Sequence, residues 1–103
     1  MCLKLKDGSR MILSRYYRYS FGKRYLYFCR RKKVDRLLVI DAVLENGEQF
    51  FDFRDFNDES NNISSNKLDG HIEITIPKDH KCRLTIKTCK SSGKYVVSIK
   101  NML

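Results

Sequence analysis

Apolar and polar residues alternate along much of this chain, and that period of two constrains its fold more than any other feature. Ile72, Ile74 and Ile76 occupy every second position before Pro77, and a similar alternation runs through 82–100. Because successive side chains of a β-strand point to opposite faces, the pattern predicts strands with one buried face. Pro77 should end the first of these strands, since proline has no backbone N–H to donate to a neighbouring strand.

Short glycine-containing motifs divide the strand-like segments. The Ser-Ser-Gly motif at 91–93 predicts the turn of a hairpin within 82–100. The Asn-Gly pair at 46–47, which is typical of a type I′ turn, predicts a second hairpin formed by 37–45 and 48–54.

Similar signals occur in the first part of the chain. The Asp-Gly pair at 7–8 predicts a turn, and Gly22 predicts a break between 10–21 and 24–28. If these two segments pair through the break, their basic residues form one patch. Strands and turns that recur every 8–12 residues or so are typical of small all-β folds. We therefore predict an all-β fold, a single small antiparallel sandwich or partly open barrel of about seven short strands.

Two segments leave an alternative open. Residues 37–44 are apolar on both faces apart from Asp41, which is typical of a central strand but also of a buried helix. Segment 55–70 is a long polar loop that could be mobile or contain a helical turn. The alternative is an α+β fold with a short helix near 35–44 or in 55–70. In both cases we expect one domain, 1–103, because a chain of this length has no room for a second.

The charge is distributed in three blocks. The chain has 21 Lys and Arg against 12 Asp and Glu, a formal net charge of +9. Residues 1–36 carry +10, residues 37–73 carry −7 and residues 74–103 carry +6. Charged surfaces often serve solubility alone. The sharper hypothesis is that the basic blocks form a face that binds a polyanion.

Arginine and lysine are interleaved with tyrosine and phenylalanine within 10–36. Cationic groups neutralise phosphates, and aromatic rings stack on exposed bases. We therefore predict a non-catalytic module that binds a polyanion through this surface, with nucleic acid as the first candidate. The candidate contact residues are Arg15, Tyr16, Arg18, Lys23, Arg24, Tyr25, Arg30, Arg31, Lys32, Lys33, Arg83 and Lys87. Alternation places the rings of Tyr17, Tyr19, Phe21 and Phe28 in the core instead.

Two other functions are compatible with the sequence. One is a small protein-interaction module, an adaptor or an inhibitor encoded by a virus or mobile element, that docks on an acidic protein surface. Its complementary charge blocks could also form a homo-oligomer. The other is a small ribonuclease-type toxin, which would need His71 or His80 as its acid or base.

Other kinds of site have little support. No Cys-x-x-Cys pair occurs among the four cysteines, and the acidic residues of 52–59 match no calcium-binding loop, so we expect no metal and no cofactor. No catalytic motif is present, and we assign no catalytic residue. Cys29 and Cys82 are expected in the core.

The sequence also suggests a location. No apolar run approaches the roughly 20 residues of a membrane-spanning helix, and no secretory signal is evident, so we expect no membrane partner and a cytoplasmic protein with reduced thiols. The basic run at 30–33 could direct a nuclear location.

Overall fold

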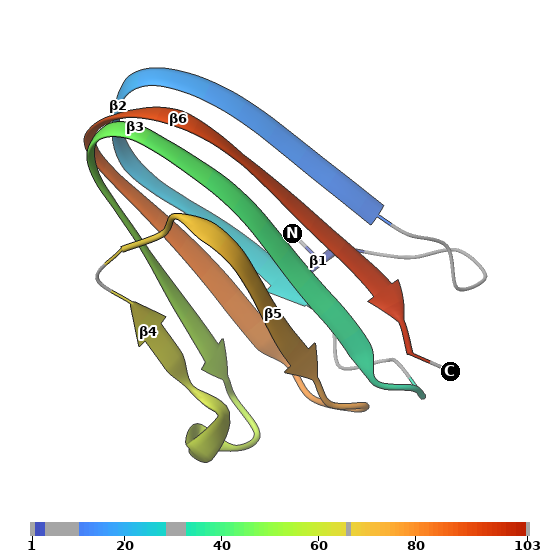
Figure 1. The fold of residues 1–103 in the computed structure, drawn as a ribbon. Coiled ribbons are helices and arrows are strands. Elements are labelled where there is room, and N and C mark those ends of the chain that lie inside the picture. Colours follow the sequence, from blue (N-terminus) through green and yellow to red (C-terminus); the bar gives the residue numbers. More distant parts are fainter. Residues whose placement is uncertain (1, 4–10, 29–32, 66, 103) are drawn as a thin grey trace.

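Three long strands that lie side by side form most of the structure (Figure 1). The computed structural model describes residues 2–3, 11–28, 33–65 and 67–102. The long strands, of 18, 20 and 20 residues, are β2 (Met11–Phe28), β3 (Arg36–Asp55) and β6 (Cys82–Asn101). The shorter strands are β1 (Cys2–Leu3), β4 (Ile63–Ser65) and β5 (Gly70–Ile76).

All of these strands belong to one six-stranded sheet. Its order is β1-β2-β6-β3-β4, and β5 pairs with β3 as well. β1 runs parallel to β2, and the other pairings are antiparallel. In the described ranges the helical structure is limited to a three-residue 3-10 turn, η1 (Glu59–Asn61). The predicted all-β antiparallel class is confirmed. The α+β alternative is wrong, because residues 36–44 lie in β3 and the described part of 55–70 contains no helix longer than the three-residue η1.

All three long strands bend at the same level of the sheet (Figure 1). The sequence predicted short strands joined by turns at Gly22, Gly47 and Gly93, and this prediction was wrong because each glycine lies within a continuous strand. At a hairpin turn, the segments before and after the turn pair with each other. Here β6 lies between β2 and β3, and it pairs with both on either side of the bend. The ladders shift register there, as β-bulges do, and bulges bend strands.

Close backbone contacts explain why glycine is needed at two of these bends. A Cβ on Gly93 would lie 2.1 Å from the carbonyl oxygen of Val43 in β3. A Cβ on Gly47 would lie 2.2 Å from the carbonyl oxygen of Lys90 in β6, and Gly47 also has a left-handed φ of +81°. The turn-like residues of the sequence therefore let neighbouring strands approach each other at the bend.

The bend folds the sheet into two facing layers, and the core lies between them (Figure 1). Each long strand contributes alternate side chains from both of its halves. The buried apolar residues include Leu26, Phe28, Leu38, Ile40, Phe51, Phe53, Ile74, Ile76, Cys82, Leu84, Ile86, Tyr95, Val97 and Ile99. The alternation predicted for 71–76 and 82–100 is confirmed, as are the end of β5 before Pro77 and the core position of Cys82. Cys29 lies outside the described residues.

Two predictions about apolar side chains need correction. Tyr17 and Phe28 are buried as expected, but Tyr19 is 69% and Phe21 75% exposed. The register of β2 shifts on both sides of Ser20, and this interrupts the alternation of faces. The outer face of segment 37–44 is only partly covered, since Leu37 and Val39 are partly buried and Val43 is 46% exposed.

The polar segment 55–70 contains more regular structure than a loop. Besides η1 it contains β4, which pairs with Phe51–Phe53 of β3. Leu68 is fully buried, and its backbone N–H donates to the Gln49 carbonyl oxygen at 2.7 Å. The Gln49 side-chain amide donates in return to the Leu68 carbonyl oxygen at 2.9 Å. Across the described ranges, no helix has the length and apolar character required to cross a membrane.

The close approach at Gly93 leads to a test of the bend. We expect Gly93→Ala to lower the free energy of unfolding by about 1–3 kcal/mol, because the added methyl group forces β3 and β6 apart. Gly22→Ala is the matched control, since Gly22 has the same φ of +159° and nothing within 4 Å of a Cβ. Urea denaturation measures both variants. Equal losses would contradict the steric role of Gly93.

Candidate nucleic-acid interface

The outer face of one layer carries basic and aromatic side chains together. Leu26 and Phe28 of β2 point into the core, so the intervening side chains of Tyr25 and Tyr27 point outward. The same alternation in β3 and β6 turns further cations to this side. We define the basic-aromatic face by the residues Lys23, Tyr25, Tyr27, Arg54, Phe56, Lys81, Arg83 and Lys87.

Like charges lie directly opposite one another on this face. Lys23 of β2 is the register partner of Lys87 in β6, and Arg54 of β3 is the partner of Arg83 in β6. None of these four forms an ion pair with a carboxylate among the described residues. Like charges at opposed positions of a sheet are destabilising. Folding alone therefore does not account for the arrangement.

Aromatic rings lie within reach of these cations. The rings of Tyr25 and Tyr27 stack with their centroids 6.4 Å apart. The Arg83 guanidinium is 5.6 Å from the Tyr25 centroid and 5.7 Å from the Phe56 centroid, and Lys81 Nζ is 5.7 Å from Phe56. Tyr25 and Phe56 are each 46% exposed. Rings held in this way can contact both the cations and an external planar group.

The acidic middle of the sequence contributes little to this face. Asp52 of β3 points to the same side, opposite Thr85, and is half-buried. Asp55 is buried on the inner side of the sheet, and Asp58 and Glu59 are exposed around η1. Glu59 also lies at the edge of the face, where it lines a shallow pocket together with Arg54 and Phe56. The five cations of the face still outnumber these carboxylates, which gives it a positive potential.

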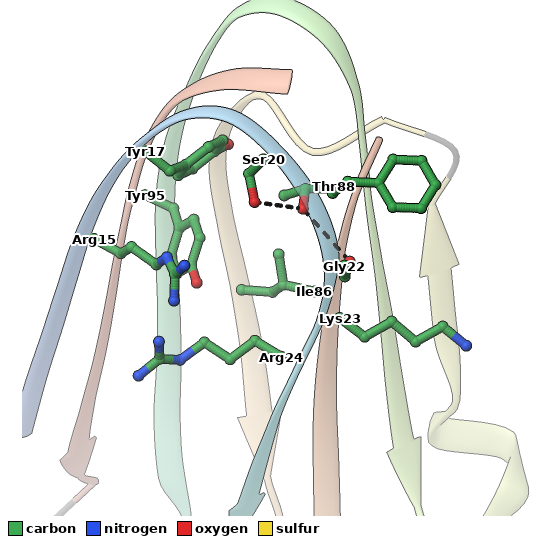
Figure 2. Close-up of a pocket in the computed structure, with 10 residues that line it drawn as sticks. Arg15, Tyr17, Ser20, Gly22, Lys23, Arg24, Ile86, Thr88 and Tyr95 are labelled. Atoms are coloured by element: carbon green, nitrogen blue, oxygen red, sulfur yellow. Dashed lines mark hydrogen bonds between the residues drawn. The ribbon is translucent and has the colours of Figure 1, made fainter. Parts of the chain in front are cut away.

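The structure divides the predicted contact residues into groups. Lys23, Tyr25, Arg83 and Lys87 lie together on the basic-aromatic face. Arg15 and Arg24 line a pocket at the bend, to which Lys23 also contributes (Figure 2). Tyr16 and Arg18 are exposed on β2 before the bend, and Lys33 is exposed before β3. Arg30, Arg31 and Lys32 lie outside the described residues.

The patch expected from a hairpin at Gly22 does not form. Residues 11–28 form one strand, so 10–21 does not pair with 24–28. The bend, not strand pairing, brings Arg15 near Arg24.

Sequence reasoning missed three members of the face. Tyr27 follows Tyr25 at a spacing of two, a signal that could have placed it beside Tyr25. Arg54 and Phe56 lie in the acidic block of the sequence, and only the pairing of β3 with β6 brings them beside Arg83.

The two histidines occupy different sites. His71 lies between Asp41 (Nδ1 to Oδ1, 2.5 Å) and Glu73 (Nε2 to Oε2, 2.7 Å). Hydrogen bonds to Glu73 and then Asp41 raise the pKa of His71 above its ordinary value. His80 contacts Asp55 at the far end of β3. Each histidine thus has its own carboxylate partners, and the two do not form an acid-base pair with one another.

Asp55 anchors the loop that follows β3. Its side chain is fully buried and accepts hydrogen bonds from the backbone N–H groups of Asn57 and Asp58 (2.9 and 3.2 Å) and from the Asn61 amide (3.0 Å). His80 Nδ1 lies 2.7 Å from Asp55 Oδ2. Burial alone would raise the pKa of Asp55, but the hydrogen bonds from Asn61, His80 and Asn57 lower it below its ordinary value.

The described thiols are not arranged as a metal site. Cys82 and Cys89 are free cysteines, and burial raises the pKa of the Cys82 thiol to about 12. In the part of the chain that the structure describes, no cluster of three or more His, Cys, Asp or Glu side chains could hold a metal ion.

The hydrogen bonds of Asp55 predict a strong and pH-dependent stabilisation. We expect Asp55→Ala to lower the free energy of unfolding by about 3 kcal/mol or more at pH 7, because four donors lose a buried acceptor. Since the folded-state pKa lies below 3.8, the wild-type advantage is present above that pH and disappears as the pH falls through the folded-state pKa.

Urea denaturation between pH 7 and pH 3 measures this difference. Asp58→Ala is the control, since its exposed carboxylate caps η1 and its loss should cost about 1 kcal/mol. If Asp55→Ala lowered the free energy of unfolding by as much at pH 3 as at pH 7, the role of the charged carboxylate would be contradicted.

Comparison with known proteins gives no family. No protein-family model matches the sequence, and no curated protein is significantly similar to it. The functional argument therefore depends on the arrangement of side chains on the fold.

Proposed function

We propose that this protein is a non-catalytic nucleic-acid-binding module that uses the basic-aromatic face. The observation that carries the proposal is the pairing of like charges beside exposed rings. Lys23 faces Lys87 and Arg54 faces Arg83, while the Tyr25 ring lies within 5.6 Å of the Arg83 guanidinium. A polyanion bound here would remove the repulsion between these cations.

The chemistry of the face favours a single strand over a duplex. Phosphates of a flexible strand can follow the row of cations, and its unpaired bases can stack on the exposed rings of Tyr25 and Phe56. The bases of a duplex are already stacked on one another, so a duplex offers only its phosphates to this face. We therefore propose single-stranded nucleic acid as the preferred partner.

The salt dependence of binding tests the role of the cations. We expect a single-stranded oligonucleotide of about 15 nucleotides to bind at about 50 mM salt, with an affinity that falls steeply as salt increases. In the double variant Lys23→Gln/Lys87→Gln, the slope of log affinity against log salt should fall in magnitude by about 1.4, because two phosphate contacts are lost. Fluorescence anisotropy at several salt concentrations measures the dissociation constants of the wild-type protein and of the double variant.

The control for this experiment is Lys100→Gln. Lys100 is exposed on β6 beyond the bend and lies outside the basic-aromatic face, so its loss should leave the slope unchanged. No binding by the wild-type protein at about 50 mM salt would overturn the proposal. The proposal would also be overturned if the salt slope fell by the same amount in Lys100→Gln as in the double variant.

Stacking on the aromatic rings predicts a separate effect. Tyr25→Ala should weaken binding of the single strand by about 1–3 kcal/mol and leave the salt slope unchanged, because it removes a stacking surface but no charge. Duplex DNA of equal length and heparin serve as comparison ligands. If all three bind equally and Tyr25→Ala has no effect, the face binds polyanions without stacking and the preference for single strands is wrong.

The same protein preparation can reveal a protein partner. The alternative function, docking on an acidic protein surface, predicts that a pull-down after nuclease treatment retains one stoichiometric protein. That retention is expected to depend on the same lysines. Together with absent oligonucleotide binding, this result would replace the nucleic-acid proposal.

A further inference from the structure

A small pocket opens at the bend of the sheet, at the edge of the basic-aromatic face, with which it shares Lys23 (Figure 2). Its volume is about 170 Å³, and both halves of β2 contribute to its walls together with β6. The lining residues that the argument uses are Arg15, Tyr17, Ser20, Arg24, Thr88 and Tyr95.

Two guanidinium groups converge on this pocket. Arg15 comes from β2 before the bend and Arg24 from β2 after it, and Figure 2 shows both side chains extending to the side of the Tyr95 hydroxyl. Burial raises the pKa of Tyr95, while the charges of Arg24 and Arg15 act in the opposite direction, which indicates that both cations lie near the ring. Neither arginine pairs with a carboxylate among the described residues, and none of the lining residues is acidic.

Hydroxyl groups form the opposite wall. The hydroxyl groups of Ser20 and Thr88 lie 2.9 Å apart, and Thr88 Oγ1 also donates to the Gly22 carbonyl oxygen at 3.5 Å. Tyr17 is only 7% exposed, and its ring lies 5.8 Å from that of Tyr95. Burial raises the pKa of the Tyr17 hydroxyl, while the side chain of Ser91, which does not line the pocket, acts on it in the opposite direction.

The size of the pocket restricts the ligand. Sites for drug-sized organic molecules usually span about 300–1,000 Å³, so this pocket is too small for a nucleoside. A water molecule occupies about 30 Å³ in the liquid, so the pocket holds roughly five waters or one small polyatomic ion. Guanidinium groups match the oxygen geometry of phosphate and donate paired hydrogen bonds to it.

We infer that the bend pocket binds one phosphate group between Arg15 and Arg24, with the hydroxyl groups of the opposite wall as further hydrogen-bonding partners. The phosphate can be a free inorganic ion or the terminal monoester of a nucleic-acid strand. The site shares only Lys23 with the basic-aromatic face, and its two arginines lie outside that face, so it does not require the proposed function.

Titration with inorganic phosphate tests this inference. We expect saturable changes in backbone amide NMR shifts that centre on residues 15–24, on Thr88 and on Tyr95, with chloride at matched ionic strength as the reference. Arg15→Gln and Arg24→Gln should each weaken phosphate binding at least tenfold. Both positions are solvent-accessible, so the variants should fold, and their amide spectra report this directly.

Lys87→Gln is the matched control, because it removes a cation from the basic-aromatic face but not from the pocket. It should bind inorganic phosphate as the wild-type protein does. The absence of a saturable phosphate response in the wild type would overturn the inference, as would a response that Arg15→Gln and Arg24→Gln both retain.

A second arm identifies the source of the phosphate. An oligonucleotide with a 5′-phosphate is compared with the same oligonucleotide bearing a 5′-hydroxyl. Tighter binding of the phosphorylated strand that Arg24→Gln abolishes assigns the pocket to strand ends, and equal binding assigns it to the free ion. If Lys87→Gln loses oligonucleotide affinity but retains phosphate binding, the face and the pocket act independently.

Discussion

The fold depends on three strands bending at one level. β6 can pass between its neighbours there because Gly93 and Gly47 bring backbone against backbone, at distances that exclude a side chain. The bend lets one sheet supply both walls of a core, so alternate residues from the two halves of each strand face one another. The described part of the chain thereby buries a continuous apolar cluster between the two halves of a single sheet.

The bend also determines where the charges lie. Lys23 and Arg24 are adjacent in sequence and both line the bend pocket, but strand alternation makes their side chains extend in opposite directions, that of Lys23 toward the outer face (Figure 2). Each location places cations near one another, and none of them forms an ion pair with a carboxylate of the described residues. The fold tolerates this repulsion between cations because its core is stabilising. A bound anion would relieve the repulsion, and that relief would favour binding. Both proposed sites therefore derive from one geometric feature.

Local patterns predicted the strands well and their ends poorly. The alternation that identified 71–76 and 82–100 depends only on side chains two residues apart, so it survives whatever the strand pairs with. The glycine motifs were misread as turns, because a glycine that reverses a chain and one that admits a neighbouring strand look alike in sequence. Tyr19 and Phe21 were misplaced for a related reason, since the bulges of β2 interrupt the alternation and nothing local marks them.

The sequence by itself determined the all-β class, the main apolar face of each strand and the excess of cations near aromatic rings. Only the tertiary structure decided which cations meet. Lys23 lies opposite Lys87, and Arg54 opposite Arg83, through pairings between strands that are distant in the chain. Pairing register between distant strands is set by the whole hydrogen-bonded sheet and its core, and no short stretch of sequence encodes it.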